Sequence, residues 1–282
     1  MVSSHFFICH KLLYFSYVYL GDYMDFKIGD FVTRNSYDND IVFEIIDIND
    51  KEAILKGVSM RLIANSPFDD LVLSIEERED EFLEHIKSQD FFIGDRNDYF
   101  YLPAKVLQID ADKSYLEKCL EFYKRNKIMA FGKVIKEEEM SKYVVKYLEE
   151  IKPDVLVITG HDAYKKSSNN EKDINSYKNT KYFINAVNEA RKYEKSHEKL
   201  LIIAGACQSN YEDLIKAGAD FASSPKRINI HALDPAIIAT SLSLLEKNKE
   251  VNLIELLSKT RYGSDGMGGL KVNGLMYVGY PR

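Results

Sequence analysis

The sequence has few cysteines, no excess of basic residues and no long apolar run after its first 25 residues. Its three cysteines, Cys9, Cys119 and Cys207, are too few and too scattered for a disulfide framework or a cysteine-rich metal site, so reducing intracellular conditions fit best. Lys and Arg number 38 against 44 Asp and Glu, and this net charge of -6 argues against a dedicated nucleic-acid-binding protein. Without an uncharged apolar run of about eighteen residues, an integral membrane core is not expected.

Metal-binding motifs are missing as well. The chain has no H-E-x-x-H motif and no carboxylate triad at metal-ligand spacing, so we expect neither a metal nor another cofactor.

Its 282 residues are 45% apolar and 29% charged, which is the balance of an ordinary globular protein. This length is enough for one large domain or two small ones.

The first 23 residues form an aromatic, apolar segment that differs in composition from the rest of the chain. A signal peptide or membrane anchor is one interpretation, but no basic cluster precedes the apolar stretch and no A-x-A-like cleavage site comes after it. Met24 is followed at once by DFKIGDFVTR, which opens a folded domain. We therefore expect residues 1–23 to be a non-native or disordered extension, with a targeting segment as the alternative.

Short strands separated by polar turns occupy residues 24–74 and predict a small antiparallel β-barrel, SH3-like in type. This region contains no His or Cys, so binding is a better expectation for it than catalysis. Residues 75–101 are rich in charge and predict a linker with a short helix.

From residue 102 to residue 282 the pattern alternates between apolar strands and amphipathic helices. Strands that are apolar on both faces predict a mostly parallel sheet with helices on both sides, an α/β domain. In such sheets ligands bind beyond the carboxyl ends of the strands. The strands are expected at 104–109, 128–131, 155–159, 200–204 and 220–222, and the helices at 113–125, 137–151, 174–194, 211–217 and 235–247.

Two of these strand ends carry reactive side chains. His161 follows the strand VLVIT, and Cys207 follows the strand LLIIA. A lone cysteine there is usually a small buried hydrophobe, and a lone histidine is often a structural hydrogen-bonding group. If the two strands are neighbours, however, the imidazole can take the thiol proton and later give it to a leaving amine. The pair therefore predicts a Cys–His dyad.

His231 is the competing base, since it also follows Cys207 and precedes a helix. It would fit a glutamine-amidotransferase-like Cys hydrolase. In the nucleophile elbow of such enzymes, however, the residue two positions after the Cys is favoured to be Gly, and here it is Ser209. We interpret His231 as structural. The glycine-rich segment Gly263–Gly269 lacks the Gly-Lys-Ser/Thr of a phosphate loop and predicts a flexible loop near the site.

The strings VLVITGHDA and LLIIAGAC resemble the caspase–gingipain–separase group of cysteine proteases, clan CD, in which apolar strands end in the catalytic His and Cys. Many members have Gly after the His, where this chain has Asp162. A closer resemblance, over Met24 to Arg282, is to the YabG family of sporulation-specific proteases. It rests on DFKIGDFVTR, SMRLIANSPFDDLV, GHDAY, AGACQS, AGADFASSP and RINIHALDP.

This resemblance implies a caspase-like fold and a thiol endopeptidase with His161 and Cys207 as the catalytic pair. It implies cleavage after Arg or Lys in spore coat and cortex-related proteins, with self-cleavage as a further expectation. It also implies that the protein works in the mother-cell cytoplasm of the sporulating cell, with the spore coat as a second location. The non-enzyme alternative is a coat scaffold that binds through its barrel and carries an inactive protease domain.

The remaining site residues are assigned on this architecture. The backbone N–H of Cys207 is the expected oxyanion donor, helped by the turn of Gly160 and Asp162. An enzyme that prefers Arg needs a carboxylate for the guanidinium, and Asp110 at the end of the first strand is our choice. The alternates are Asp162 and Asp173. Asp112 is expected to cap the helix after it instead.

Overall fold

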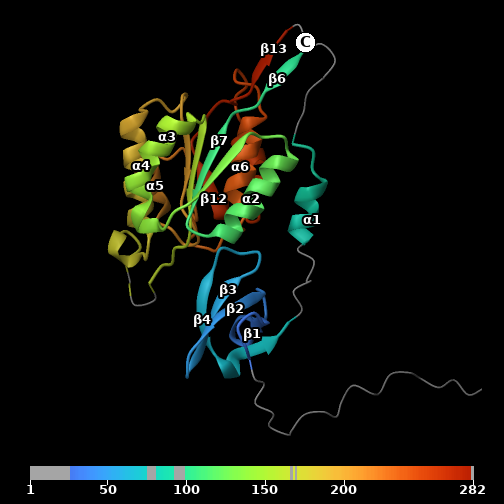
Figure 1. The fold of residues 1–282 in the computed structure, drawn as a ribbon, viewed down its shortest axis with the longest axis vertical. Coiled ribbons are helices and arrows are strands. Elements are labelled where there is room, and N and C mark those ends of the chain that lie inside the picture. The colour runs from blue at the N-terminus through green and yellow to red at the C-terminus, as the bar shows by residue number, and fades with distance from the viewer. Residues whose placement is uncertain (1–25, 75–80, 92–98, 166–167, 169, 281–282) are drawn as a thin grey trace, which may run out of the picture.

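The structure is a computed structural model of the chain, and it describes residues 26–74, 81–91, 99–165, 168 and 170–280. The expectation for residues 1–23 lies outside this part of the chain. The described residues form a large α/β domain and a smaller antiparallel sheet, with the small sheet below the large domain in Figure 1.

The large domain is built on a six-stranded sheet with the order β12-β11-β10-β9-β7-β8. The strands pair in parallel except for β12, which runs antiparallel to β11, so the predicted mostly parallel sheet is confirmed. The strands are β7 (Val106–Asp110), β8 (Ala130–Val134), β9 (Val155–Thr159), β10 (Leu201–Ala204), β11 (Phe221–Ser223) and β12 (Met267–Gly269).

Helices cover both faces of this sheet, as Figure 1 shows. Alternation along each strand explains the two layers: Val155 and Val157 point into one apolar core, while Leu156 and Ile158 point into the other. The first core is covered by α2 (Lys113–Arg125) and α6 (Asp234–Ser243). The second is covered by α3 (Met140–Ile151), α4 (Thr180–Tyr193) and α5 (Tyr211–Lys216), with the 3-10 turns η3 (Glu137–Glu139) and η4 (Ile174–Ser176) before α3 and α4.

The small sheet has the order β4-β3-β2-β1-β5 and its own apolar core, which includes Val32, Phe43 and Leu55. It does not close into the predicted SH3-like barrel, because its edge strands β4 and β5 do not pair with each other within residues 26–74. The elements are β1 (Phe31–Arg34), β2 (Phe43–Ile48), β3 (Glu52–Gly57), β4 (Ile63–Pro67) and β5 (Leu71–Leu73), with 3-10 turns η1 (Asn35–Tyr37) and η2 (Phe68–Asp70).

The charged segment between the two parts contains α1 (Glu81–Ser88), which the sequence predicts as a short helix. Ile86 and Phe91 are buried in the first core of the large domain, so this segment packs on the domain it precedes. Farther along, β6 (Phe100–Leu102) pairs with β13 (Tyr277–Gly279) near the end of the chain. Within the residues that the structure describes, none of the helices has the length and apolar character needed to cross a bilayer.

The carboxyl-terminal glycine segment is not the predicted flexible loop. It forms α8 (Gly263–Gly266) and the edge strand β12, after α7 (Leu253–Ser258). Gly269 is needed for close packing, since a Cβ there would lie 2.6 Å from the carbonyl oxygen of Asp220 on the neighbouring chain segment.

The connection between β3 and β4 brings the two parts together. Met60, in this connection, forms an antiparallel bridge with His231 of the large domain. Figure 1 shows the upper end of the small sheet at the edge of the large sheet, close to the beginning of α2. The connection therefore lies at the edge where the functional residues are expected.

Candidate active site

β9 and β10 are neighbours, as the dyad prediction requires. They pair in parallel, with Val155 opposite Leu201 and Ile158 opposite Ala204. The segments that come after them, which carry His161 and Cys207, therefore leave the sheet side by side at its carboxyl edge.

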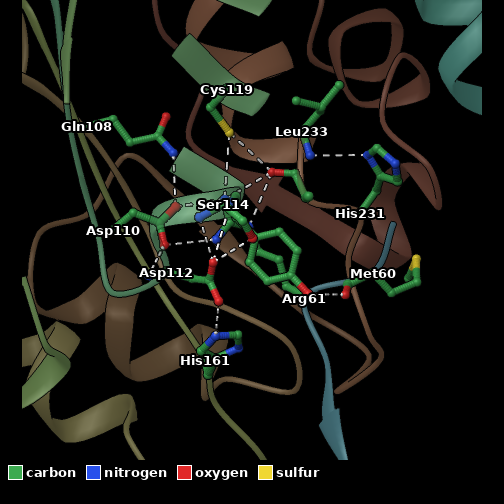
Figure 2. A network of polar contacts seen from close by, with 12 residues as sticks. Met60, Arg61, Gln108, Asp110, Asp112, Ser114, Cys119, His161, His231 and Leu233 are labelled. Atoms are coloured by element: carbon green, nitrogen blue, oxygen red, sulfur yellow. Dashed lines mark hydrogen bonds and ion pairs between the residues drawn. The ribbon is translucent and has the colours of Figure 1, made fainter. Parts of the chain in front are cut away.

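His161 is held by two carboxylates. Its backbone N–H donates to Oε1 of Glu137 at 2.8 Å, and its ring Nε2 lies 3.1 Å from Oδ2 of Asp112 (Figure 2). The other ring nitrogen, Nδ1, is buried and has no hydrogen-bond partner among the described residues. A carboxylate at Nε2 favours the tautomer with the proton on that nitrogen. Nδ1 is then the free acceptor, which is what a general base requires.

Asp112 joins the start of α2 to this histidine. As predicted, it is the N-cap of α2, and its carboxylate accepts hydrogen bonds from the N–H groups of Ser114 and Tyr115. It also pairs with Nζ of Lys56 at 2.6 Å. Burial alone would raise the pKa of Asp112, but hydrogen bonds from His161, Lys56 and Ser114 outweigh burial and hold its pKa well below the usual range. Asp112 is therefore an anion at neutral pH.

Cys207 is fully buried beside a different backbone segment. Its Sγ accepts a hydrogen bond from the N–H of Ile230 at 3.3 Å and lies 3.8 Å from the Ile230 carbonyl oxygen. No hydrogen bond joins Cys207 to His161 in this structure, and within the described chain the Cys207 N–H also donates none. Burial raises the pKa of the Cys207 thiol to about 12. A thiol in this state is protonated at neutral pH and reacts slowly.

The backbone around Cys207 is tightly turned. Gly205 has a φ of 109°, a conformation that suits glycine, and Gln208 has a φ of 56°. Asp162 connects this turn to that of His161, because its carboxylate accepts hydrogen bonds from the hydroxyls of Ser209 and Thr180. Asp162 also accepts hydrogen bonds from two backbone N–H groups, those of Ala163 at 2.9 Å and Asn179 at 2.7 Å.

The two alternates for the specificity pocket are thus engaged locally. Burial raises the pKa of Asp162 despite its hydrogen bonds, and both of its oxygens face groups of its own domain. Asp173 caps η4 by accepting from the N–H of Asn175 at 2.9 Å. Gly160 approaches Glu137 so closely that a Cβ there would lie 2.7 Å from Oε1, so a larger residue would displace the carboxylate that accepts from the N–H of His161.

Asp110, the first choice for the pocket, binds an arginine of the same chain. Arg61 comes from the β3–β4 connection, and its Nη1 and Nη2 lie 3.1 Å and 2.9 Å from the two oxygens of Asp110 (Figure 2). Both side chains are 0% exposed. Nε of Arg61 donates to the carbonyl oxygen of Ala232 at 3.2 Å, and Nη2 lies 3.6 Å from Sγ of Cys119. Burial would lower the pKa of Arg61, but Asp110 and its neighbours outweigh it, so the guanidinium stays charged.

His231, the competing base, is buried and takes part in local packing. Its Nδ1 accepts a hydrogen bond from the N–H of Leu233 at 3.1 Å, and its own N–H donates to Asp234 at 2.8 Å. Its ring packs edge-on against Phe82, with ring centroids 4.9 Å apart. These contacts agree with the structural interpretation of His231.

Sequence reasoning missed four residues that shape the site: Arg61, Lys56, Glu137 and Tyr115. Each reaches the site from another element, so no spacing in the sequence links it to His161 or Cys207. Arg61 offers the one usable signal, because it interrupts the apolar run of SMRLIA and a buried arginine requires a carboxylate partner.

Comparisons with known proteins agree over nearly the whole chain. It matches the family described as YabG peptidase U57 over residues 27–91 and 79–281. It is 39% identical, over 286 aligned residues, to the sporulation-specific protease YabG of Bacillus subtilis strain 168, with 92% of this chain and 99% of that protein covered. Among solved structures, a pilus assembly-related protein of Burkholderia pseudomallei K96243 aligns at 16% identity over 52% of this chain and 96% of its own. Its TM-score of 0.30 is too low to inform on fold or function.

Proposed function

Since this chain belongs to the YabG peptidase family and is therefore a peptidase, we propose that it is a cysteine endopeptidase with Cys207 as nucleophile and His161 as general base and acid. The observation that supports this most is the pairing of β9 with β10, which brings the two residues to one sheet edge. Asp112 orients the ring of His161, and Nδ1 remains free to accept a proton.

In the reaction, Nδ1 of His161 takes the thiol proton of Cys207, and the thiolate attacks the carbonyl carbon of the substrate. His161 then gives the proton to the leaving amine, and a thioester remains on Cys207. Water, deprotonated by His161, hydrolyses the thioester and restores the thiol. Because Sγ now contacts Ile230, the Cys207 side chain must turn toward His161 as the substrate binds.

The developing oxyanion is stabilised by backbone N–H groups. The N–H of Cys207 donates to no group of the described chain, so it is available for this role. The turn of Gly160 and Asp162 supplies the second donor. Asp162 holds the two turns together through Ser209 and thereby keeps these donors in place.

The substrates that we propose are spore coat and cortex-related proteins, cut after Arg or Lys in the mother cell of the sporulating cell. The related Bacillus subtilis protein is named a sporulation-specific protease, which supports this setting. The large domain is caspase-like in our proposal, with His and Cys after adjacent parallel strands. Asp110 forms the floor of the pocket for the basic side chain. Arg61 shows that the carboxylate can pair with both terminal nitrogens of a guanidinium.

The direct test is cleavage of an Arg-containing peptide by the purified protein, with and without prior treatment by a thiol alkylator. Cleavage that the alkylator abolishes supports the thiol peptidase. A folded protein that cleaves no peptide would favour the coat-scaffold alternative. Cleavage that survives alkylation of Cys207 would exclude the proposed nucleophile.

We expect Asp112→Asn to lower kcat about tenfold to hundredfold while KM changes little, because the ring of His161 loses the anion that orients it. Asn also caps helices well, so the fold is retained. Steady-state kinetics on the purified variant measure both parameters, and circular dichroism checks the fold.

Lys56→Ala is the matched control for this variant, because it removes the other ionic partner of Asp112 and leaves the contact with His161. It should not lower kcat. An Asp112→Asn enzyme with wild-type kcat would show that Asp112 serves only as a helix cap.

A further inference from the structure

The β3–β4 connection, Val58–Leu62, lies along the active-site edge and forms an isolated antiparallel bridge there, between Met60 and His231. The N–H of Arg61 donates to the carbonyl oxygen of Ile230 at 3.2 Å, and the N–H of Ala232 donates to the carbonyl oxygen of Ser59 at 3.0 Å. Alternating backbone hydrogen bonds of this kind are how extended peptides bind to an exposed strand edge.

The segment of the large domain that pairs with this connection also contacts the proposed nucleophile. The N–H of Ile230 bonds to Sγ of Cys207 at 3.3 Å, while the Ile230 carbonyl oxygen accepts from Arg61. One residue therefore touches both the proposed nucleophile and the backbone of Arg61. A substrate that binds beside Cys207 needs the same backbone groups.

The side chain of Arg61 fills a pocket built for a guanidinium. Asp110 binds two of its nitrogens, the Ala232 carbonyl oxygen accepts from Nε and Nη2, and the ring of Tyr115 lies 5.0 Å from Cζ. A buried ion pair contributes little net stability compared with a well-packed apolar pair. The stability of the fold alone thus does not explain an arginine at position 61. An arginine that competes with the substrate for an arginine-binding pocket does explain it.

We propose that the Val58–Leu62 connection is a built-in inhibitor of this peptidase, which occupies the substrate groove in substrate-like form with Arg61 in the pocket for the basic residue. This inference rests on the proposed function of Cys207 and His161. A substrate enters only when the connection withdraws. The apparent affinity for substrate therefore equals the affinity of the open form multiplied by the fraction of molecules that are open.

Hydrogen bonds within the small sheet and from α2 hold the connection in place, whereas a substrate peptide would have none of these contacts. The N–H of Leu62 donates to the carbonyl oxygen of Met60 at 2.8 Å, and that of Gly57 donates to Leu62 at 2.7 Å. The hydroxyl of Tyr115 on α2 lies 2.6 Å and 2.8 Å from the carbonyl oxygens of Gly57 and Met60. β3 and β4 flank the connection, so the peptide bond between Arg61 and Leu62 lies in a tight turn. The N–H of Leu62 is hydrogen-bonded within the connection, which disfavours departure of the Leu62 nitrogen as the leaving amine.

The first test is Arg61→Ala. We expect kcat/KM for a peptide that ends in an Arg-linked fluorogenic amide to rise about tenfold or more, because the open fraction increases. Alkylation of Cys207 by iodoacetamide, measured by mass spectrometry, should accelerate in parallel. Arg191→Ala is the matched control, since Arg191 pairs with buried Asp220 at 2.6 Å away from this edge and should change neither rate.

A small guanidinium probes the vacated pocket directly. Agmatine should raise the melting temperature of Arg61→Ala and slow its Cys207 alkylation, while it leaves the wild-type melting temperature unchanged. The Arg191→Ala control should show no such response, because nothing in our inference gives that position a ligand.

Tyr115→Phe covers the case in which Arg61→Ala does not fold. It removes the hydroxyl contacts with the connection and keeps the ring, so kcat/KM and Cys207 alkylation should rise severalfold, with Tyr193→Phe on α4 as control. Folded Tyr115→Phe enzyme with both rates unchanged would overturn the inhibitor. Cleavage that persists in Cys207→Ala would instead overturn the proposed function, so the two failures are distinguishable.

Discussion

Cys207→Ala should lower kcat/KM for peptide cleavage by about 10,000-fold or more and leave the folded structure intact. Without the thiol no covalent intermediate forms, so catalysis falls to what binding and the backbone donors supply. Alanine fits the space of a cysteine that is already fully buried, and the polar contacts that are lost are those of the sulfur with Ile230. Steady-state kinetics with circular dichroism on the same preparation measure both effects.

The histidines separate the two enzyme hypotheses. His161→Ala should lose nearly as much activity as Cys207→Ala, because the thiol then has no base. His231→Ala should keep kcat within about tenfold while its melting temperature falls, since the ring packs on Phe82 and accepts from Leu233. The opposite order, with His231→Ala inactive and His161→Ala active, would support the amidotransferase-like alternative. Retention of more than a trace of activity by Cys207→Ala would exclude the proposed mechanism.

The sheet could be predicted, together with the edge where His161 and Cys207 follow neighbouring strands, because the signals are local. Residues 155–159 are apolar or nearly so throughout, and the structure has β9 over the same residues, all of them buried. Likewise α2 begins directly after its predicted cap Asp112 and ends at Arg125. Parallel strands share a carboxyl edge by geometry, so the neighbouring positions of His161 and Cys207 could be inferred once the strands were identified.

Contacts between distant elements could not be predicted in this way. The pair of Arg61 and Asp110 joins two sheets, and nothing in the sequence near either residue indicates the other. The open small sheet has a similar explanation: short strands and polar turns are common to barrels and open sheets, and closure depends on whether the edge strands β4 and β5 meet. In β12, glycines that suggest a mobile loop instead permit close packing on Phe221.

Asp110→Asn should lower kcat/KM for Arg substrates by about tenfold to a thousandfold, which corresponds to about 1.5–4 kcal/mol for a charge-assisted pair. In the otherwise wild-type chain this variant also leaves Arg61 buried without its anion, which destabilises the fold and weakens the inhibitory contact. The two effects on activity oppose each other. The substitution is therefore best made in the Arg61→Ala enzyme, where no arginine of the chain itself pairs with Asp110. The oxygen of asparagine can still accept the hydrogen bond that Asp110 receives from the N–H of Asp112.

The matched substrate is a peptide with citrulline in place of Arg, which keeps the shape of the side chain and removes its charge. Between Arg61→Ala and the double variant, kcat/KM should fall for the Arg peptide and change little for the citrulline peptide, because only the former pairs ionically with Asp110. Both enzymes lack Arg61, and the citrulline peptide corrects for any effect of the substitution on Gln108 or Asp112, which also donate hydrogen bonds to Asp110. If a folded double variant kept its full preference for Arg over citrulline, the carboxylate would have to be sought at Asp162 or Asp173.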